Sequence, residues 1–398
     1  MIPSLRQQYN RQFTEDKYKA YLTDLENLYP GHLDFRIAET PVFVPKEFVQ
    51  KMVSACESII DRVNTSDYFR QSSKAIPPDL AVPGEEHQPQ FIAFDFGVCF
   101  DETGGLEPQL IEMQGFPTLF AWQILQPEIQ HNHFPWPEGF SIFLNGYNRE
   151  KYIQLLKEIL IGDSDPAAVV LLEIFPEKQK TRVDFWATED LTGVKTVCLT
   201  DLIPEGRNLY YLRDGKKTRI ERIYNRLIFD DLQQQSPEVQ EKGKILFQDF
   251  DVTWVPHPNW FYRLSKYTLP FIDHPNVPAT RFLSQADPLP DDLENYVVKP
   301  LFSFAGQGVI IDVTQEAIAQ IKDPENWILQ KKVPYAAVIE TPDEPAKCEI
   351  RLFYFWPRGA DRPIAVNNLC RLSKGKMIGV RYNKDKTWVG GTFGLFEQ

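Results

Sequence analysis

The sequence has no cluster of basic residues, and acidic residues are in excess. It contains 43 lysine and arginine residues against 55 aspartate and glutamate residues, for a formal net charge of −12 at pH 7. A basic stripe or block is the usual electrostatic feature of a surface that binds nucleic acid or an anionic membrane. Its absence argues against both as the main partner.

Cysteine is scarce, and no long apolar run is present. The most apolar stretch, residues 167–172, ends at Glu173 and is far too short to cross a bilayer. The first 22 residues mix both charges and do not resemble a secretory signal. The five cysteines form an odd set without a CxxC pair, which argues against a disulfide framework or a cysteine zinc site. We therefore expect a cytoplasmic protein without a membrane span.

The chain does contain enough apolar material for substantial cores. Hydrophobic residues make up 43% of its 398 residues and aromatic residues 13%, which excludes a disordered or fibrous chain. This length suits two or three packed units. The sequence does not indicate an oligomeric state.

Three segments are expected, and together they predict an α+β fold with an α/β subdomain. Residues 1–150 begin with helical apolar spacing and end with a strand hairpin. Residues 151–285 alternate helices with continuous apolar strands, which is typical of a small, mostly parallel α/β unit. Residues 286–398 are expected to form an antiparallel α+β unit.

The hairpin carries the first candidate site. The strand FIAFDFGVCF is followed by a DETGG turn and the strand QLIEMQ. If the turn is centred between Thr103 and Gly104, Asp95 faces Glu112 with Cβ atoms about 5 Å apart. Gln114 then shares the face of Glu112, because alternate residues of a strand point to the same side. The opposite face is expected to be core, with these residues: Ile92, Phe94, Phe96, Val98, Ile111 and Met113.

Two directly opposed carboxylates repel one another unless a cation lies between them. Magnesium suits the oxygen ligands that Asp95, Glu112 and Gln114 would provide, and removal of Glu112 should then relieve repulsion in the free protein. Two other interpretations fit the sequence equally well. The register can slip by one residue, or both acids can point into solvent.

A glycine-rich segment, VVKPLFSFAGQGVII, carries the second candidate site. Its β-rich first part ends at Lys299, and Gly306 and Gly308 follow in the loop. Paired glycines permit a tight turn whose backbone N–H groups face phosphate oxygens, and the lysine adds a positive charge. The segment matches neither common nucleotide-binding signature, and such a hairpin is often only a turn.

Polar residues also interrupt apolar strands near the C-terminus. In WILQKKV, Gln330, Lys331 and Lys332 could offer hydrogen bonds to a purine ring or simply end a strand. Arg351 and Arg371 lie in otherwise apolar strands, where each could pair with an acid or hold phosphate.

Taken in order, these motifs resemble those of glutathionylspermidine synthase and the synthetase domain of trypanothione synthetase. PQLIEMQGFPTLFAWQ is similar to the family's LLEYNADTPTSLLEA segment, FIAFDFG to its RxDF strand and LSKYTLPFI to its SNKALLP motif. YVVKPLFSFAGQGVII is similar to its YVxKPxxGREGxNV loop. The resemblance covers most of the chain from about residue 44 to WILQKKV. It implies a circularly permuted ATP-grasp fold, in which antiparallel sheets sandwich the nucleotide.

The resemblance also implies ATP and magnesium, with two ions, and assigns residues to them. The positions of the family's magnesium ligands are occupied by Asp95, Glu112 and Gln114, where Gln114 replaces an asparagine. Lys266 and Lys299 correspond to lysines that bind ATP phosphates. The flexible phosphate lid corresponds to residues 303–308, which include Ser303, Gly306, Gln307 and Gly308. The adenine hinge corresponds to residues 330–333, which are Gln330, Lys331, Lys332 and Val333.

The chain departs from the family at several points. The arginine of RxDF is replaced by Ala93, so we expect Arg351 or Arg371 to take its catalytic role. The family's C-terminal motif is not recognisable, and no amidase domain precedes the ligase region. The substrates therefore stay open within the implied class of a small-molecule or peptide carboxylate and an amine.

The function implied by the resemblance is an ATP- and magnesium-dependent carboxylate–amine ligase. It forms an amide through an acyl phosphate. Two alternatives remain. Ala93 favours a degenerate module that binds nucleotide without ligase activity, and a small-molecule phosphotransferase would give a phosphorylated product without an amide.

Overall fold

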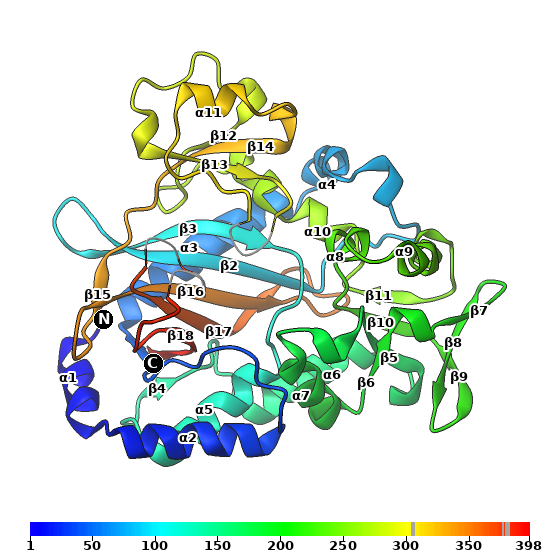
Figure 1. The fold of residues 1–398 in the computed structure, drawn as a ribbon, viewed down its shortest axis with the longest axis horizontal. Helices are drawn as coiled ribbons and strands as arrows, with labels where there is room; N and C mark the ends of the chain where they lie inside the picture. Colours follow the sequence, from blue (N-terminus) through cyan, green and yellow to red (C-terminus); the bar gives the residue numbers. More distant parts are fainter. Residues whose placement is uncertain (304–306, 376–377, 379–382) are drawn as a thin grey trace.

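The computed structural model describes residues 1–303, 307–375, 378 and 383–398. Within these residues, five β-sheets and the surrounding helices form a mixed α+β fold (Figure 1). Most of the sheets are antiparallel, and one is parallel. The predicted α+β class with an α/β unit is confirmed.

An antiparallel sheet forms the centre of the molecule, with strand order β18-β17-β16-β2-β3 and β15 paired to β16. The strands are β2 (Phe91–Phe100), β3 (Leu106–Gln114), β15 (Ala337–Ile339), β16 (Ala346–Phe355), β17 (Ile364–Ser373) and β18 (Gly390–Thr392). Helix α3 (Lys46–Val63) packs on one face, where its apolar stripe joins Phe94 and Phe96 in a core. An amphipathic helix requires such a partner to bury its apolar side.

The predicted register of the hairpin is confirmed at the acids, since Asp95 pairs with Glu112 and Ala93 with Gln114. A β-bulge follows, and Phe96 pairs with Leu110. Ile111 is the extra residue of the bulge and lines a cavity, so its predicted place in the core is wrong. Leu110 is the fully buried residue instead.

The α/β unit contains a four-stranded parallel sheet of order β11-β10-β5-β6. Its strands are β5 (Val169–Glu173), β6 (Lys195–Cys198), β10 (Arg222–Asn225) and β11 (Thr253–Val255). Helices α6 (Arg149–Ile161) and α7 (Arg182–Thr192) share an apolar core with it. A separate antiparallel sheet extends to the right in Figure 1 and consists of β7 (Ile203–Glu205), β8 (Asn208–Arg213) and β9 (Lys216–Ile220). The chain then forms short helices, α8 (Phe229–Gln233), α9 (Pro237–Gly243) and α10 (Trp260–Arg263).

A small lobe at the top of Figure 1 holds the sheet β12-β14-β13 and helix α11 (Gln315–Ala319). Its strands are β12 (Thr280–Phe282), β13 (Tyr296–Pro300) and β14 (Trp327–Lys331). Val298 and Ile310 exchange backbone hydrogen bonds of 3.0 and 2.9 Å, so the chain does return along β13. Gly308 has φ +73°, and an added Cβ there would lie 2.8 Å from Pro300 Cγ, so this turn requires glycine.

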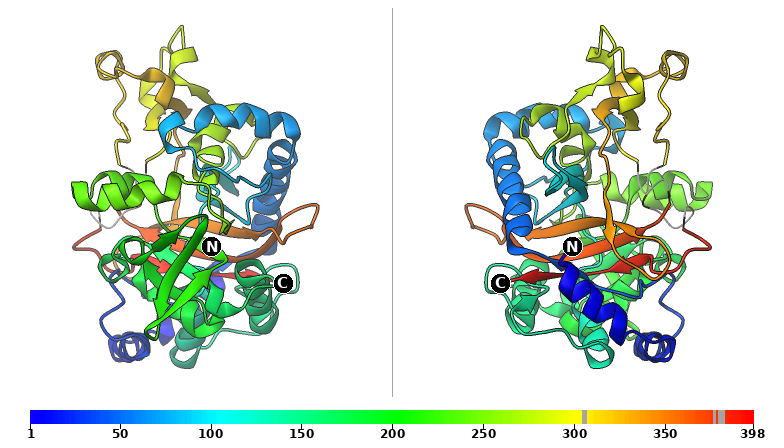
Figure 2. Two further views of the ribbon diagram at one scale, coloured as in Figure 1. Left: turned by 90° about the vertical axis from the view of Figure 1, so that its right-hand side faces the viewer. Right: turned by 90° about the vertical axis from the view of Figure 1, so that its left-hand side faces the viewer.

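The two ends of the chain meet in a further sheet. Strand β1 (Val42–Val44) runs parallel to β19 (Gly394–Glu397), which also pairs with β4 (Phe140–Ser141). In Figure 1, helices α2 (Glu15–Leu28) and α5 (Trp122–His133) lie below this sheet, and α1 (Pro3–Gln12) lies to its left. In Figure 2 the C-terminus lies below the central sheet and the N-terminus lies at its level.

The remaining helix, α4 (Ser66–Ser72), follows α3. Helix α3 has 18 residues, a length that bears on whether a helix could span a membrane. Helix α3 contains several lysine and glutamate residues. No helix in the described part of the chain combines the length and the apolar character needed to span a membrane.

The sheets do not follow the three predicted segments. Strand β16, from residues 286–398, pairs with β2 in the hairpin of residues 1–150. Strand β12, from residues 151–285, pairs with β14. The division at residue 285 is therefore not a boundary between sheets.

Candidate functional site

A cavity of about 670 Å³ lies where the central sheet, the small lobe and the parallel sheet meet. Its lining comes from residues that are far apart in sequence. Most of the residues predicted for a nucleotide site line it: Glu112, Gln114, Lys266, Lys299, Ser303, Gln330, Lys332, Val333, Arg351 and Arg371. A concave site with a few convergent polar groups is the usual form of a small-molecule site.

The other predicted residues lie apart from this lining. Asp95 is buried behind Arg351 and Arg371, with only 1% of its surface exposed. Gln307, Gly308 and Lys331 are exposed. Gly306 lies outside the described residues.

Lys299 lies near the end of β13 and is buried in the cavity wall. Its Nζ donates to Gln330 Oε1 at 2.6 Å and to the carbonyl of Ile111 at 3.2 Å. The bulge in β3 therefore places a carbonyl against this lysine. Burial lowers the pKa of Lys299 to about 8, although the Glu112 carboxylate acts to raise it.

Lys266 begins a 3-10 helix whose N-cap, Ser265, accepts a hydrogen bond from the backbone of Tyr267. Its Nζ donates to the carbonyl of Ser303 at 2.8 Å and lies 3.5 Å from Glu112 Oε2. Burial acts to raise the pKa of Glu112. Four nearby cations, Lys266 first, outweigh this effect and lower that pKa to about 2.

Arg351 and Arg371 approach the cavity from β16 and β17. Arg351 binds Asp95 in a bidentate pair, with Nε–Oδ1 and Nη2–Oδ2 distances of 2.5 Å. Arg371 Nη2 lies 3.1 Å from Asp95 Oδ2 and also binds Glu349. Tyr335 OH donates to Glu349 Oε2 at 3.2 Å, and burial raises the pKa of Glu349. We call Lys266, Lys299, Arg351 and Arg371 the cation cluster.

The residues present fit the predicted three-ligand magnesium set only in part. Arginine N–H groups occupy both oxygens of Asp95. Among the described residues, no three His, Cys, Asp or Glu side chains are grouped so that they could hold a metal ion. Glu112 and Gln114 line the cavity and are the oxygen donors left for an ion. The cations that offset Asp95 and Glu112 are lysine and arginine side chains.

The cavity fits a polyanionic ligand better. It gathers the cation cluster in a buried wall, where charges are weakly screened. Ser303 Oγ and Arg371 Nε are buried donors with no hydrogen-bond partner within the described residues. Buried polar groups are normally satisfied, so such orphaned donors indicate a missing partner.

In the predicted adenine hinge, two of the backbone N–H groups that could face a purine ring already have partners. The backbone N–H groups of Lys331 and Lys332 already donate to Ala279 and Asn295, at 2.9 and 2.8 Å. Gln330 contributes its side chain, which accepts from Lys299 and donates to Thr280 at 3.1 Å. Recognition of a purine ring at this strand stays a prediction.

A polar end of the cavity, at the carboxyl ends of the parallel strands, was not predicted from the sequence. Glu173 ends β5, and burial raises its pKa to about 8. Arg226 follows β10 and pairs with the buried Asp184 at 2.8 Å. Asp231 and Gln179 also line this end. Polar residues directly after buried parallel strands are the sequence feature that could have indicated it, since ligands bind at that edge of such sheets.

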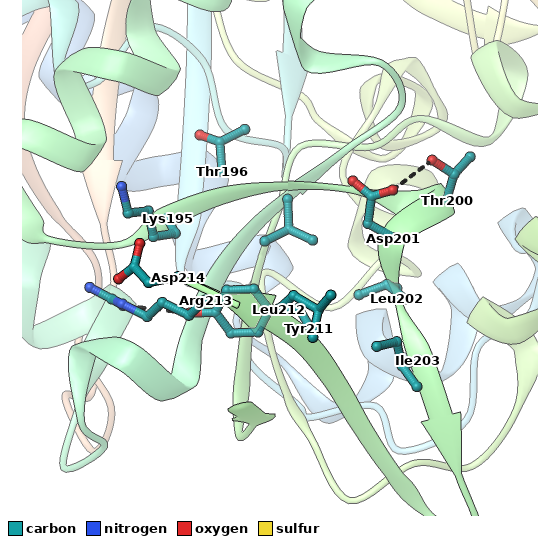
Figure 3. A pocket seen from close by; sticks show the side chains of 11 residues that line it. Lys195, Thr196, Thr200, Asp201, Leu202, Ile203, Tyr211, Leu212, Arg213 and Asp214 are labelled. Atoms are coloured by element: carbon teal, nitrogen blue, oxygen red, sulfur yellow. Dashed lines mark hydrogen bonds between the residues drawn. The ribbon is translucent and has the colours of Figure 1, made fainter. Parts of the chain in front are cut away.

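A second cavity, of about 580 Å³, lies between β6 and the sheet of β7–β9 (Figure 3). Its polar lining carries both charges: Figure 3 shows Lys195 and Arg213 near Asp214, and Asp201 on the other side of the cavity beside Thr200. Lys195 already pairs with Glu189. This cavity shares no lining residue with the first.

No protein-family model matches the chain, and no curated protein matches it. Among solved structures, it is similar to a glutathione synthetase-like effector from Globodera pallida, in its apo form. The TM-score is 0.56 at 9% sequence identity, and the match covers 97% of this chain and 98% of the other. The two chains share a fold. The likeness agrees with the coarser part of the sequence prediction, a mixed α+β fold, and does not bear on the permuted chain order or on glutathionylspermidine synthase.

Proposed function

We propose that the protein is an ATP- and magnesium-dependent ligase that joins a carboxylate to an amine on an ATP-grasp fold. The observation that supports this most strongly is the cation cluster, in which two lysines and two arginines line one buried cavity. Buried cations cost free energy unless anions offset them; Asp95, Glu112 and Glu349 offset part of this charge, and phosphate oxygens would offset the rest. The likeness to a glutathione synthetase-like protein agrees with this class of enzyme.

The phosphate end of the cavity would be formed by Lys266, Lys299 and Ser303. Lysines act as point charges on phosphate oxygens, and the orphaned Ser303 hydroxyl adds a donor. Glu112 and Gln114 would hold magnesium, which supplies positive charge to the phosphates when bound.

The opposite end would receive the carboxylate and the amine. Arg226 is a buried cation suited to a carboxylate, and Glu173 and Asp231 are acids suited to an ammonium group. An amine must lose a proton to become a nucleophile, and a carboxyl group with a pKa of about 8 can accept one at mildly basic pH.

The test is a screen of carboxylate and amine pairs for ATP consumption, with products identified by mass spectrometry. An amide that forms together with ADP and phosphate would support the proposal. Lys299→Met should abolish turnover, and Lys216→Met, on the exposed strand β9, should not. Turnover that survives Lys299→Met would place the chemistry elsewhere.

A second candidate is a module that binds nucleotide without ligating substrates. The occupation of Asp95 by arginines favours it, because one predicted magnesium ligand is not available in this arrangement. ATP binding without consumption across the whole screen would favour this candidate. A phosphorylated product without an amide would favour a phosphotransferase.

A further inference from the structure

Asp95 is a buried carboxylate whose neighbours are two guanidinium groups. We propose that Asp95 is a positioning residue, which holds Arg351 and Arg371 in the cavity wall, and that it does not ligate magnesium. The inference rests on the proposed function, since it concerns the same cavity.

The hydrogen bonds of Asp95 leave little room for an ion. Its Oδ1 accepts from Arg351 Nε, and its Oδ2 accepts from Arg351 Nη2 and Arg371 Nη2. Bidentate arginine–carboxylate pairs are among the strongest hydrogen-bonded pairs in proteins. An ion that took these oxygens would leave the largely buried Arg351 and the partly exposed Arg371 each short of a partner, which is unfavourable.

The sheet explains why one carboxylate can orient both arginines. Arg351 on β16 is directly opposite Asp95 on β2, and Arg371 on β17 is directly opposite Glu349 on β16. Directly opposite residues point to the same face of a sheet. Arg371 therefore bridges Glu349 and Asp95, while Arg351 also donates to Thr118 Oγ1 at 3.3 Å.

Both arginines are fixed on one side and line the cavity on the other. Arg371 Nε has no hydrogen-bond partner within the described residues. A guanidinium group that is already held in one orientation loses less conformational entropy when it binds an anion. Asp95 would thus act on a polyanionic ligand through the arginines and not through a metal ion.

The two roles of Asp95 predict different magnesium dependence. ATP affinity of the full chain is measured by calorimetry in EDTA and over a series of MgCl₂ concentrations, for wild type, Asp95→Asn, Arg351→Met and the double variant. A positioning role predicts that Asp95→Asn weakens ATP binding at least about tenfold and leaves the MgCl₂ midpoint within about twofold of wild type. Asp95→Asn should cost less ATP affinity in the Arg351→Met background than in wild type, because Arg351→Met has already removed one of the two arginines that Asp95 holds.

A matched control is the bidentate pair between the partly buried Glu85 and the buried Arg263, neither of which lines the cavity. Glu85→Gln should lower thermal stability and leave ATP affinity unchanged. A general loss of folding would affect both variants alike, so the contrast isolates the role of Asp95. A MgCl₂ midpoint that rises more than about tenfold in Asp95→Asn overturns the proposal, and so does unchanged ATP affinity in that variant.

If Asp95→Asn does not fold, the double variant is measured in its place. It also lacks the charge of Arg351, which the single change leaves without a partner. Its MgCl₂ midpoint should then equal that of Arg351→Met, and a tenfold rise overturns the proposal. Wild-type protein that binds sodium tripolyphosphate but not ATP overturns the proposed function alone, and the same variants are then compared with tripolyphosphate. Wild-type protein that binds neither probe overturns both.

Discussion

Replacement of Lys299 by methionine should make the free protein more stable near neutral pH while it removes nucleotide binding. Lys299 is 8% exposed, and burial lowers its pKa from 10.5 to about 8. Methionine has a similar length and carries no charge. The substitution therefore removes the cost of keeping a buried ammonium group charged.

The shift from 10.5 to about 8 corresponds to about 3 kcal/mol, at roughly 1.36 kcal/mol for each pH unit. Against this, methionine loses the hydrogen bonds to Gln330 and to the Ile111 carbonyl, at about 1 kcal/mol each. The expected net gain at pH 7 is about 1 kcal/mol. Little reduction for solvent screening applies, because the side chain is buried.

The sign of the pH dependence follows from proton binding. Between pH 8 and 10.5 the unfolded chain keeps a proton on Lys299 that the folded chain releases, so wild-type stability rises relative to the variant. The advantage of the variant should disappear and reverse by pH 10. Below pH 8 the cost is fully present, and the variant should stay the more stable of the two.

Urea unfolding of both proteins at pH 7, 8, 9 and 10 measures this difference directly. The control is Lys216→Met, which removes an exposed lysine on β9. Its free energy of unfolding should stay within about 0.5 kcal/mol of the wild-type value at pH 7. A difference between wild type and Lys299→Met that does not change with pH would refute the lowered pKa. A large loss of stability of Lys299→Met at pH 7 would refute the inference that the buried charge of Lys299 destabilises the free protein.

Three further predictions concern other parts of the site and the hairpin. Glu112→Gln should lower the free energy of unfolding at pH 7 by up to about 3 kcal/mol, because cations lower the pKa of Glu112 to about 2. In acid titrations this loss should shrink as the pH falls from 4.5 to 2. This reverses the sequence expectation that its removal relieves repulsion. Gly308→Ala should cost about 1–3 kcal/mol in thermal unfolding, because φ is positive and the new Cβ meets Pro300. Leu110→Ala should cost about 2–5 kcal/mol, whereas Ile111→Ala should cost clearly less; equal losses would contradict the bulge.

Local patterns in the sequence predict the elements of the fold well. The apolar stripe of α3, the continuous apolar strand β5 and the alternation of β2 all depend on residues close in sequence. The arithmetic of the hairpin also places Asp95 opposite Glu112. The bulge cannot be predicted in this way, because one extra residue in a strand pairing leaves no mark on the alternation of β3.

The pairings between distant strands cannot be found in this way. Strand β16 joins β2 across about two hundred and fifty residues of chain, and β1 joins β19 at the other end. These contacts depend on packing over the whole molecule and not on local preference. The partners of Asp95 come from β16 and β17. From the sequence, a metal ion could therefore be proposed as the missing cation, but the two arginines could not be identified as the partners of Asp95.

This arrangement also bears on the arginine that the resemblance expects at Ala93. Ala93 and Asp95 share a face of β2, and Arg351 lies opposite Asp95 on the neighbouring strand, so a guanidinium group still reaches the cavity. A small side chain at Ala93 is compatible with Phe353, a fully buried residue that pairs with it on β16. The positive charge is thus supplied from the adjacent strand and held there by Asp95. The loss of one arginine from the motif is therefore weak evidence for loss of the site, because the sheet provides the charge from a position that lies elsewhere in the sequence.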